Sequence, residues 1–296
     1  MDYYNEIKNE LLNNELYKKV KDYSKNRSDL QTYYSVGKLL SNADKQYGKN
    51  IIKKYSIKLT KELGGKYSVR LLYKMIKYYN FASNEKVPTL SAQLSWSHYD
   101  ELLKFSDINK IIYYINISFE QNLSIRQLRQ RIKLNEYERL PKRTKDKLVN
   151  NKNINISDMI KNPIIIKNKY NTTSISEKVL KKLILEDIDT FLKELGDGFC
   201  YIGNEYKIKL GNNYNYIDIL LFNIKYNCYV VIELKITELK KEHIGQIEIY
   251  MNYVDNNIKN TYHDKTIGII ICKKQNKFII EYTSDKRILQ RKYILK

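Results

Sequence analysis

Two acidic residues and a lysine interrupt the most apolar part of the sequence. Asp218 stands in the run YIDILLF, and Glu233 and Lys235 stand in the run YVVIELK. Because strand side chains alternate between two faces, Glu233 and Lys235 would share one face. An unpaired carboxylate is costly to bury, and a partner, a metal or a shifted pKa ordinarily relieves that cost. Antiparallel pairing of the two runs would bring Asp218 beside Glu233, and two converging carboxylates are typical ligands of Mg²⁺.

The Glu-x-Lys triplet on its own is also the pattern of an ordinary surface ion pair. The combination is more specific, because Asp218 lies one strand before the triplet and the triplet closes an apolar strand. An acid-bearing helix is also expected just upstream of the strands.

The elements that must position these residues have a mixed α/β pattern. Residues 176–195 have the periodicity of one long helix and are followed by Gly196, a residue type common after a helix end. Three strand-like runs, a helix and a final pair of strands follow, at 198–211, 215–225, 228–235, 240–257 and 266–283. This order predicts a mixed sheet with helices packed against it.

The first half of the chain has a different character. Residues 1–140 carry apolar side chains at helical spacing, and the polar residues 141–173, with two prolines and several asparagines, have the composition of a linker that contains a short helix. The predicted fold class is therefore α+β overall. An all-helical domain at 1–140 is followed by a linker at 141–173 and an α/β domain at 174–296.

Two helices of the first half are candidates for a helix-turn-helix. The stretches 49–63 and 67–82 are separated by Gly64 and Gly65, and Ser68 is well placed to cap the second helix. The second helix of such a motif can lie in a DNA major groove, and three basic side chains would point outward from it. These are Arg70, Lys74 and Lys77. An ordinary helical hairpin would have a similar sequence.

Arginines gather between positions 126 and 143, and they suit phosphate oxygens because the guanidinium forms forked hydrogen bonds. The candidates for contact with nucleic acid are Arg126, Arg129 and Arg131, followed by Arg139 and Arg143. A solvated helix face is the alternative interpretation of this cluster.

The formal net charge of +20 favours a polyanionic partner such as nucleic acid or an acidic membrane. Part of the lysine excess is attributable to A/T-rich codons, since Asn, Ile and Tyr are abundant as well. The three cysteines have neither disulfide nor zinc-ligand spacing, and no apolar run approaches the ~20 residues needed to span a bilayer. We therefore expect a cytoplasmic protein without a membrane partner.

The acidic runs, preceded by a Glu-bearing helix, resemble the PDDEXK nuclease core of restriction endonucleases and many repair nucleases. The stretch HIGQIEIYMNYVD adds Gln246 and Tyr250, which resemble the Gln-x-x-x-Tyr element of the RecB-like branch. Together with YGKNIIKKYSIKLTKELGGKYSVRLLYKM, LSWSHYDELLK and FLKELGDGFCYIG, these stretches resemble the bacterial YhcG-type family. That resemblance implies a winged-helix-like, DNA-binding N-terminal domain at 1–140 and a nuclease domain at 174–296.

The resemblance also implies roles for individual residues. Asp218, Glu233 and the backbone carbonyl of Leu234 would hold Mg²⁺, or Mn²⁺ in its place. Glu177, which opens the upstream helix, would be the helix acid, with Glu186 as its rival, while charge on a helix surface would explain either residue. Lys235 would orient the attacking water or stabilise charge on the phosphate. Gln246 and Tyr250 would be the accessory pair, although a polar helix face would also produce them.

The function that follows is a metal-dependent nuclease, and a DNA endonuclease is the leading expectation. The alternatives are a catalytically silent nucleic-acid-binding or adaptor protein that retains the nuclease fold, and a structural basic protein. Many endonucleases of this superfamily cut both strands as dimers, so a homodimer is expected by analogy alone.

Overall fold

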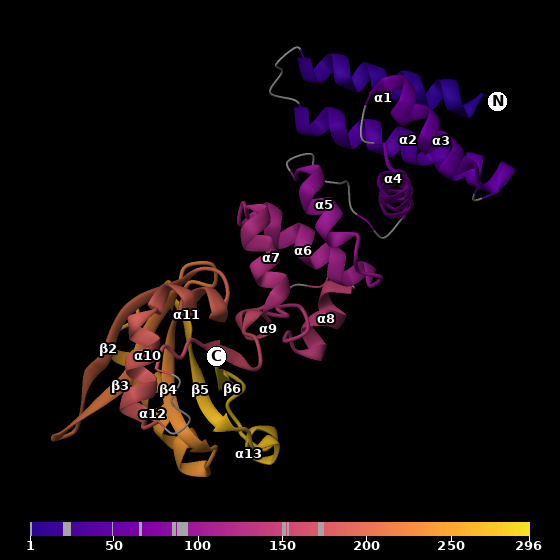
Figure 1. Ribbon diagram of the computed structural model, residues 1–296. Helices are drawn as coiled ribbons and strands as arrows, with labels where there is room; N and C mark the ends of the chain where they lie inside the picture. The colour runs from indigo at the N-terminus through magenta and orange to yellow at the C-terminus, as the bar shows by residue number, and fades with distance from the viewer. Residues whose placement is uncertain are drawn as a thin grey trace. The chain divides into compact units, whose positions relative to one another are not determined.

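The computed structural model describes residues 2–19, 25–48, 50–64, 67–84, 87, 94–149, 152, 154–170 and 175–296. They divide into two compact units, Met1–Tyr137 and Glu138–Lys296 (Figure 1). The first unit is built of helices and the second contains a mixed sheet, so the predicted fold class is confirmed. No helix among the described residues is both long and apolar enough to cross a membrane.

The described part of the first unit contains only helices, so the strands of a wing are absent from it. Its helices are α1 (Tyr3–Lys19), α2 (Lys25–Tyr47), α3 (Asn50–Leu63), α4 (Val69–Ala82), α5 (Trp96–Leu102), α6 (Ile108–Glu120) and α7 (Ile125–Lys133).

The two helices predicted as a helix-turn-helix are α3 and α4. Gly64 follows α3 with a φ of 60°, and Gly65 lies outside the described residues. Ser68 caps α4 as predicted, because its side chain accepts a hydrogen bond from the Leu71 amide at 3.3 Å.

The closest packing of α4 is against α2. At Gly37 of α2 an added Cβ would lie 2.2 Å from the Met75 carbonyl oxygen of α4, so only glycine permits this approach. Leu72 and Met75 of α4 are fully buried in the same core as Val36 and Leu40 of α2. These helices therefore belong to a larger bundle.

The second unit is built on a six-stranded sheet with the order β1-β6-β5-β4-β3-β2. The pairs β2–β3 and β3–β4 are antiparallel, and β4–β5, β5–β6 and β1–β6 are parallel. Its elements are α8 (Lys142–Val149), α9 (Ile156–Met159), β1 (Ile164–Ile166), α10 (Glu177–Glu186), α11 (Ile188–Leu195), β2 (Phe199–Leu210), β3 (Asn213–Asn223), β4 (Cys228–Glu238), α12 (Lys241–Asn257), β5 (Asp264–Lys274), α13 (Lys277–Glu281) and β6 (Ile288–Leu295).

The central strands are apolar on both faces because helices cover both. Val230, Ile232 and Leu234 of β4 join a core with the apolar faces of α10 and α11. Val231 of β4 and Ile270 of β5 join a second core with α12. The continuous apolar run of β4 therefore reflects a strand buried on both faces rather than a half-exposed one.

Two predicted elements differ in the structure. The single helix expected at 176–195 is broken at Asp187, whose φ and ψ of −140° and 51° are not helical, so that α10 and α11 form. The prediction of a second strand at the end of 266–283 was wrong, since α13 occupies that place. The Asn276 side chain accepts a hydrogen bond from the Ile279 amide at 3.4 Å and begins this helix, and the last strand is β6.

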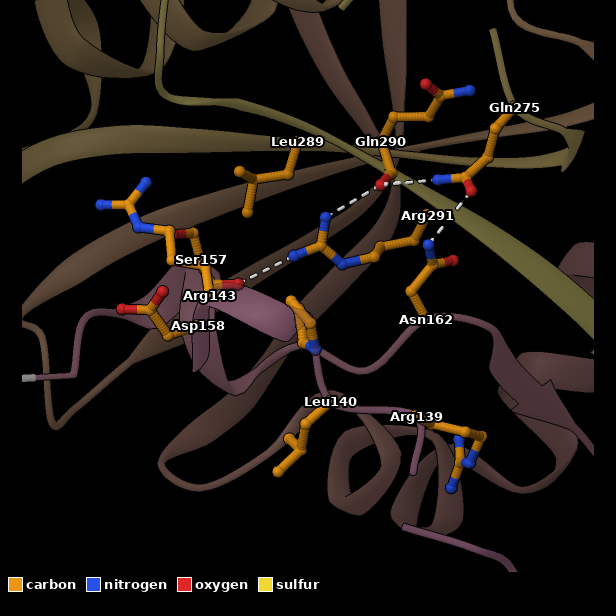
Figure 2. A pocket seen from close by; sticks show the side chains of 11 residues that line it. Arg139, Leu140, Arg143, Ser157, Asp158, Asn162, Gln275, Leu289, Gln290 and Arg291 are labelled. Carbon is orange, nitrogen blue, oxygen red and sulfur yellow. Dashed lines mark hydrogen bonds between the residues drawn. The ribbon is translucent and has the colours of Figure 1, made fainter. Parts of the chain in front are cut away.

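The segment expected as a linker is instead packed into the second unit where it is described. Its strand β1 pairs with β6, with Ile164 opposite Tyr293. The Arg291 guanidinium of β6 donates to the carbonyl oxygens of Ile160 at 3.0 Å and Ser157 at 2.8 Å. A pocket of about 310 Å³ lies beside this arginine, and Figure 2 shows the guanidinium between the carbonyls of Ser157 and Gln290.

A buried ion pair fixes the start of the same segment. Arg139, which we expected at the surface among the other arginines, is buried and hydrogen-bonds Glu194 of α11 through two nitrogens. Glu194 also accepts a hydrogen bond from the Ile165 amide of β1 at 3.0 Å, and Arg139 donates to the Pro163 carbonyl at 2.9 Å. The pair therefore joins three parts of the unit.

Replacing Glu194 by alanine tests this role. The Arg139 guanidinium would lose its carboxylate and the Ile165 amide its acceptor, so we expect the free energy of unfolding of the unit to fall by about 3–5 kcal/mol. Native-state hydrogen exchange of the β4 and β5 amides measures that free energy. The exposed Glu281→Ala variant is the control, and an equal effect of both substitutions would contradict the role of the pair.

Candidate active site

Asp218 and Glu233 lie on neighbouring antiparallel strands. The ladder between β3 and β4 includes Ile219 opposite Ile232, and Asp218 and Glu233 are the next residues along. The Oδ2 atom of Asp218 accepts a hydrogen bond from the Leu234 amide at 3.0 Å. The structure therefore brings both predicted acids together. At this point the Asp218 side chain, in place of a backbone carbonyl of β3, accepts the hydrogen bond of a β4 amide.

Glu233 is a buried carboxylate with one unpaired oxygen. Its side chain is 3% exposed, and its Oε1 atom accepts a hydrogen bond from Lys235 at 2.8 Å. Its Oε2 atom has no hydrogen-bond partner among the described residues. Burial, with a further contribution from the charge of Asp218, raises the pKa of Glu233 to about 7, although Lys235 opposes the shift. The carboxylate therefore has an unmet requirement for positive charge.

Lys235 shares the face of Glu233 and carries a charge fixed by its neighbours. Burial lowers the pKa of Lys235, but the hydrogen bond and charge of Glu233, with the charges of Glu177 and Asp218, outweigh burial and raise it above its usual value. Lys235 is therefore an ammonium group at neutral pH, directed at the acidic cluster.

Of the two candidate helix acids, Glu177 is the one that contacts the site strand. It is the first residue of α10, its Oε1 atom accepts a hydrogen bond from the Ile236 amide at 3.4 Å, and its Oε2 atom lies 4.0 Å from Lys235 Nζ. Glu186 instead accepts a hydrogen bond from the Tyr170 hydroxyl at 2.8 Å. The geometry favours Glu177.

The sequence analysis missed Lys181, one helical turn after Glu177. Its ammonium group lies 2.9 Å from Asp218 Oδ1 and 3.1 Å from Glu205 Oε1. Residues four apart lie on one helix face, so the spacing from Glu177 was the available signal. A second cation thus stabilises Asp218, as Lys235 stabilises Glu233.

Gln246 and Tyr250 pair with each other on α12. The Gln246 side-chain amide donates to the Tyr250 hydroxyl at 3.1 Å, and Tyr250 is buried in the core between α12 and the sheet. Within the described part of the chain, neither forms a hydrogen bond with Asp218, Glu233 or Lys235. His243 of the same helix is buried, and burial and then the charge of Lys235 lower its pKa, so its imidazole is neutral near the site.

The two central acids suit a hard divalent cation. Asp218, Glu233 and the Leu234 carbonyl offer oxygen donors, and the unpaired Oε2 atom of Glu233 fits the requirement for an added positive charge. Glu177 does not complete a larger set, since the described residues contain no group of three or more His, Cys, Asp or Glu side chains that could hold an ion. The residues that fit a metal are therefore two carboxylates.

The six basic residues of the first unit that were predicted to contact nucleic acid fall into two classes. Three form ion pairs inside the first unit: Lys74 with Asp100 at 2.5 Å, Arg129 with Glu101 at 2.8 Å and Arg131 with Glu136 at 2.9 Å. The other three, Arg70, Lys77 and Arg126, are exposed and form no ion pair with a described residue. Only the second class presents an uncompensated charge.

Two family models together match most of the chain. Residues 11–139 match the DUF1016 N-terminal domain, and residues 157–295 match the YhcG PDDEXK nuclease domain. The chain belongs to the YhcG-type PDDEXK nuclease family. The nuclease-domain match begins in α9, within the segment that we expected to be a linker, and includes β1 of this YhcG-type protein.

One relative is the protein named "Putative nuclease YhcG" of Escherichia coli (strain K12). It is 24% identical over 204 residues, which are 66% of this chain and 54% of that protein. The YhcG-type chain described here therefore spans about half the length of that relative.

Two solved structures are similar to part of this chain. A repair endonuclease from Pyrococcus abyssi has 19% identity and a TM-score of 0.30, over 41% of this chain and 48% of that chain. EndoMS in a complex with double-stranded DNA has 20% identity and a TM-score of 0.31, over 42% of this chain and 48% of that chain.

The raised pKa of Glu233 predicts a pH-dependent stability. The usual pKa of 4.5 rises to about 7 in the fold, so the stabilisation due to Glu233 is complete below pH 4.5 and is lost as the pH rises to 7. The side chain of Glu233→Gln stays neutral at every pH. Without divalent cations we therefore expect its free energy of unfolding above pH 7 to be about 3 kcal/mol greater than that of wild type.

Urea unfolding in EDTA at a series of pH values measures this difference, with Glu281→Gln as the control. A Glu233→Gln profile parallel to that of wild type from pH 4.5 to 7 would show that the buried carboxyl is not shifted.

Proposed function

We propose that this protein is a divalent-metal-dependent nuclease that hydrolyses phosphodiester bonds of DNA, with Mg²⁺ as the expected ion and Mn²⁺ as the alternative. The observation that carries the proposal is the buried pair of Asp218 and Glu233 with Lys235, on adjacent strands of a PDDEXK nuclease domain. The net charge of +20 suits a polyanionic substrate.

Asp218, Glu233 and the Leu234 carbonyl would hold the ion, which when bound polarises a phosphodiester and lowers the pKa of a bound water. The Leu234 amide and Lys181 hold the Asp218 carboxylate in place. Lys235, kept charged by Glu233, orients the attacking water or stabilises negative charge on the phosphate. Glu177 fixes the end of β4 through the Ile236 amide and faces Lys235.

A catalytically silent nucleic-acid-binding protein is the second candidate. It is favoured by the two ammonium groups that already compensate the acids, Lys181 on Asp218 and Lys235 on Glu233. In such a protein the cations would replace a metal permanently, and the cleavage experiment below separates the two functions.

We expect wild-type protein to cleave at least one substrate of a panel of supercoiled, linear and branched DNA in Mg²⁺ and none in EDTA. Asp218→Asn and Lys235→Met should each reduce the rate at least about 100-fold, because Asp218 would hold the ion and Lys235 stabilises negative charge on the phosphate. Gel assays with RNA as a further substrate measure the rates, and thermal unfolding verifies that the variants fold.

Glu281→Gln, at an exposed glutamate of α13, is the matched control for these variants and should cleave as wild type does. Two outcomes would refute the nuclease: no cleavage of any substrate with either Mg²⁺ or Mn²⁺, or equal cleavage by wild type and Asp218→Asn.

The helical unit is proposed to bind DNA through its uncompensated cations. Alanine at Arg70, Lys77 or Arg126 should each lower the slope of log affinity against log salt by about 1 if the side chain contacts a phosphate. Arg131→Ala is the comparison, since it removes the partner of buried Glu136 and should lower thermal stability instead. Unchanged salt slopes in fluorescence anisotropy would count against this unit as the DNA-binding part.

The proposed setting is the cytoplasm, which is consistent with three free cysteines, Cys200, Cys228 and Cys272. A homodimer is also proposed, from the analogy with endonucleases that cut both strands, and light scattering of the purified protein measures the oligomeric state.

A further inference from the structure

The strands β2 and β3 form a long hairpin that reaches beyond the helices covering the rest of the sheet (Figure 1). They contain 12 and 11 residues, and from Tyr206 opposite Ile217 their pairing continues without interruption to Leu210 opposite Asn213 at the tip. Gly211 in the turn has a φ of 60°, a left-handed conformation that glycine adopts easily. The tip is therefore a regular two-stranded ribbon.

The two faces of this ribbon differ. On one face Ile208 and Ile217 are fully buried in the core that includes α12. The other face carries two lysines and two tyrosines, which pair across the strands as Lys207 with Tyr216 and Lys209 with Tyr214. We name Lys207, Lys209, Tyr214 and Tyr216 the hairpin stripe.

The hairpin stripe is exposed and positively charged. Tyr214 is 55% and Tyr216 is 52% exposed, and both lysines are exposed as well. The Lys207 ammonium lies 3.8 Å from the centroid of the Tyr214 ring, and neither lysine forms an ion pair with a described residue. The stripe therefore combines uncompensated cations with exposed aromatic side chains.

The hairpin stripe leads directly into the active site. Asp218 follows Tyr216 by two residues on β3, so the two side chains lie on the same face of the strand. On β2, Glu205 precedes Lys207 by two residues. Lys181 joins Asp218 and Glu205, which places both on one side of the ribbon. At a rise of ~3.3 Å per residue, Tyr216 and Tyr214 lie about 7 and 13 Å from Asp218 along the strand.

A nucleic acid is the occupant that this geometry fits. A phosphodiester held at Asp218 is continued on either side by further phosphates, and lysines bind these as point charges. Bases and sugars stack on open tyrosine rings, and a two-stranded ribbon fits into a groove of a duplex. Both acids beside the stripe, Glu205 and Asp218, are paired with Lys181.

We propose that the hairpin stripe binds the nucleic-acid strand that flanks the scissile phosphodiester, with Lys207 and Lys209 on its phosphates and Tyr216 against a base or sugar. This inference rests on the proposed nuclease function and adds a substrate-binding surface within the nuclease unit itself. Binding by this protein then depends on two regions, the helical unit and the hairpin.

The test uses the full chain and anisotropy of a fluorescein-labelled DNA duplex and of its separate strand, in EDTA and over a series of salt concentrations. The double variant Lys207→Ala/Lys209→Ala should lower the salt slope by about 2, one unit for each lost phosphate contact. Tyr216→Ala should weaken binding of at least one of the two ligands about 10-fold with little change of slope.

Matched controls come from exposed residues elsewhere in the same unit. Lys225→Ala removes a lysine at the opposite end of β3, in the turn before β4, and Tyr282→Ala removes a tyrosine that is 82% exposed. Both should bind as wild type does. Thermal unfolding verifies that the variants fold, as their exposure predicts.

Wild-type affinity and salt slope in the double variant for both ligands would overturn the inference, as would equal losses in the Lys225→Ala control. Because binding is measured in EDTA, it does not depend on cleavage. A protein that binds through the stripe but cleaves nothing would refute the proposed nuclease and leave the hairpin stripe established as a binding surface.

Discussion

The carboxylate of Glu233 is buried on β4, a strand that packs apolar side chains against helices on both of its faces, and cations are what can stabilise its charge there. Lys235 supplies one cation at 2.8 Å, and the second carboxylate oxygen is unpaired. Asp218 adds a like charge on the neighbouring strand, which Lys181 offsets from α10. The positions of the other site residues are therefore set by the electrostatic requirement of one buried acid.

The same requirement explains how the strands are arranged at the site. β3 and β4 form a regular ladder as far as Ile219 and Ile232. Beyond that point the Asp218 side chain accepts the hydrogen bond of the Leu234 amide. Leu234 remains paired with Ile271 of β5 on its other side. The strand that carries Glu233 and Lys235 is thus fixed from both sides, which holds functional groups in place without a loop.

Local patterns in the sequence predicted much of this. The apolar runs located β3 and β4, alternation placed Glu233 and Lys235 on one face, and the residue types located the cap at Ser68. Interactions between distant segments could not be predicted in this way. The pairing of β1 with β6, the burial of Arg139 against Glu194 and the contact of Lys181 with Asp218 all join residues whose separation carries no periodic signal. The strand expected in place of α13 was wrong because its apolar residues suit either element and the Asn276 cap decides between them.

The place of β6 has a consequence for synthesis of the chain. This strand is the last of the sheet in sequence, yet it lies between β1 and β5. As the chain leaves the ribosome, the helical unit can fold before β6 has been synthesised. Until then β1 and the edge of β5 lack the strand that lies between them. Nascent β5 then has an unpaired parallel edge, the kind of surface that invites aggregation or chaperone binding until β6 is made. The order of translation therefore delays completion of the sheet, and with it the active site, until after the helical unit has emerged.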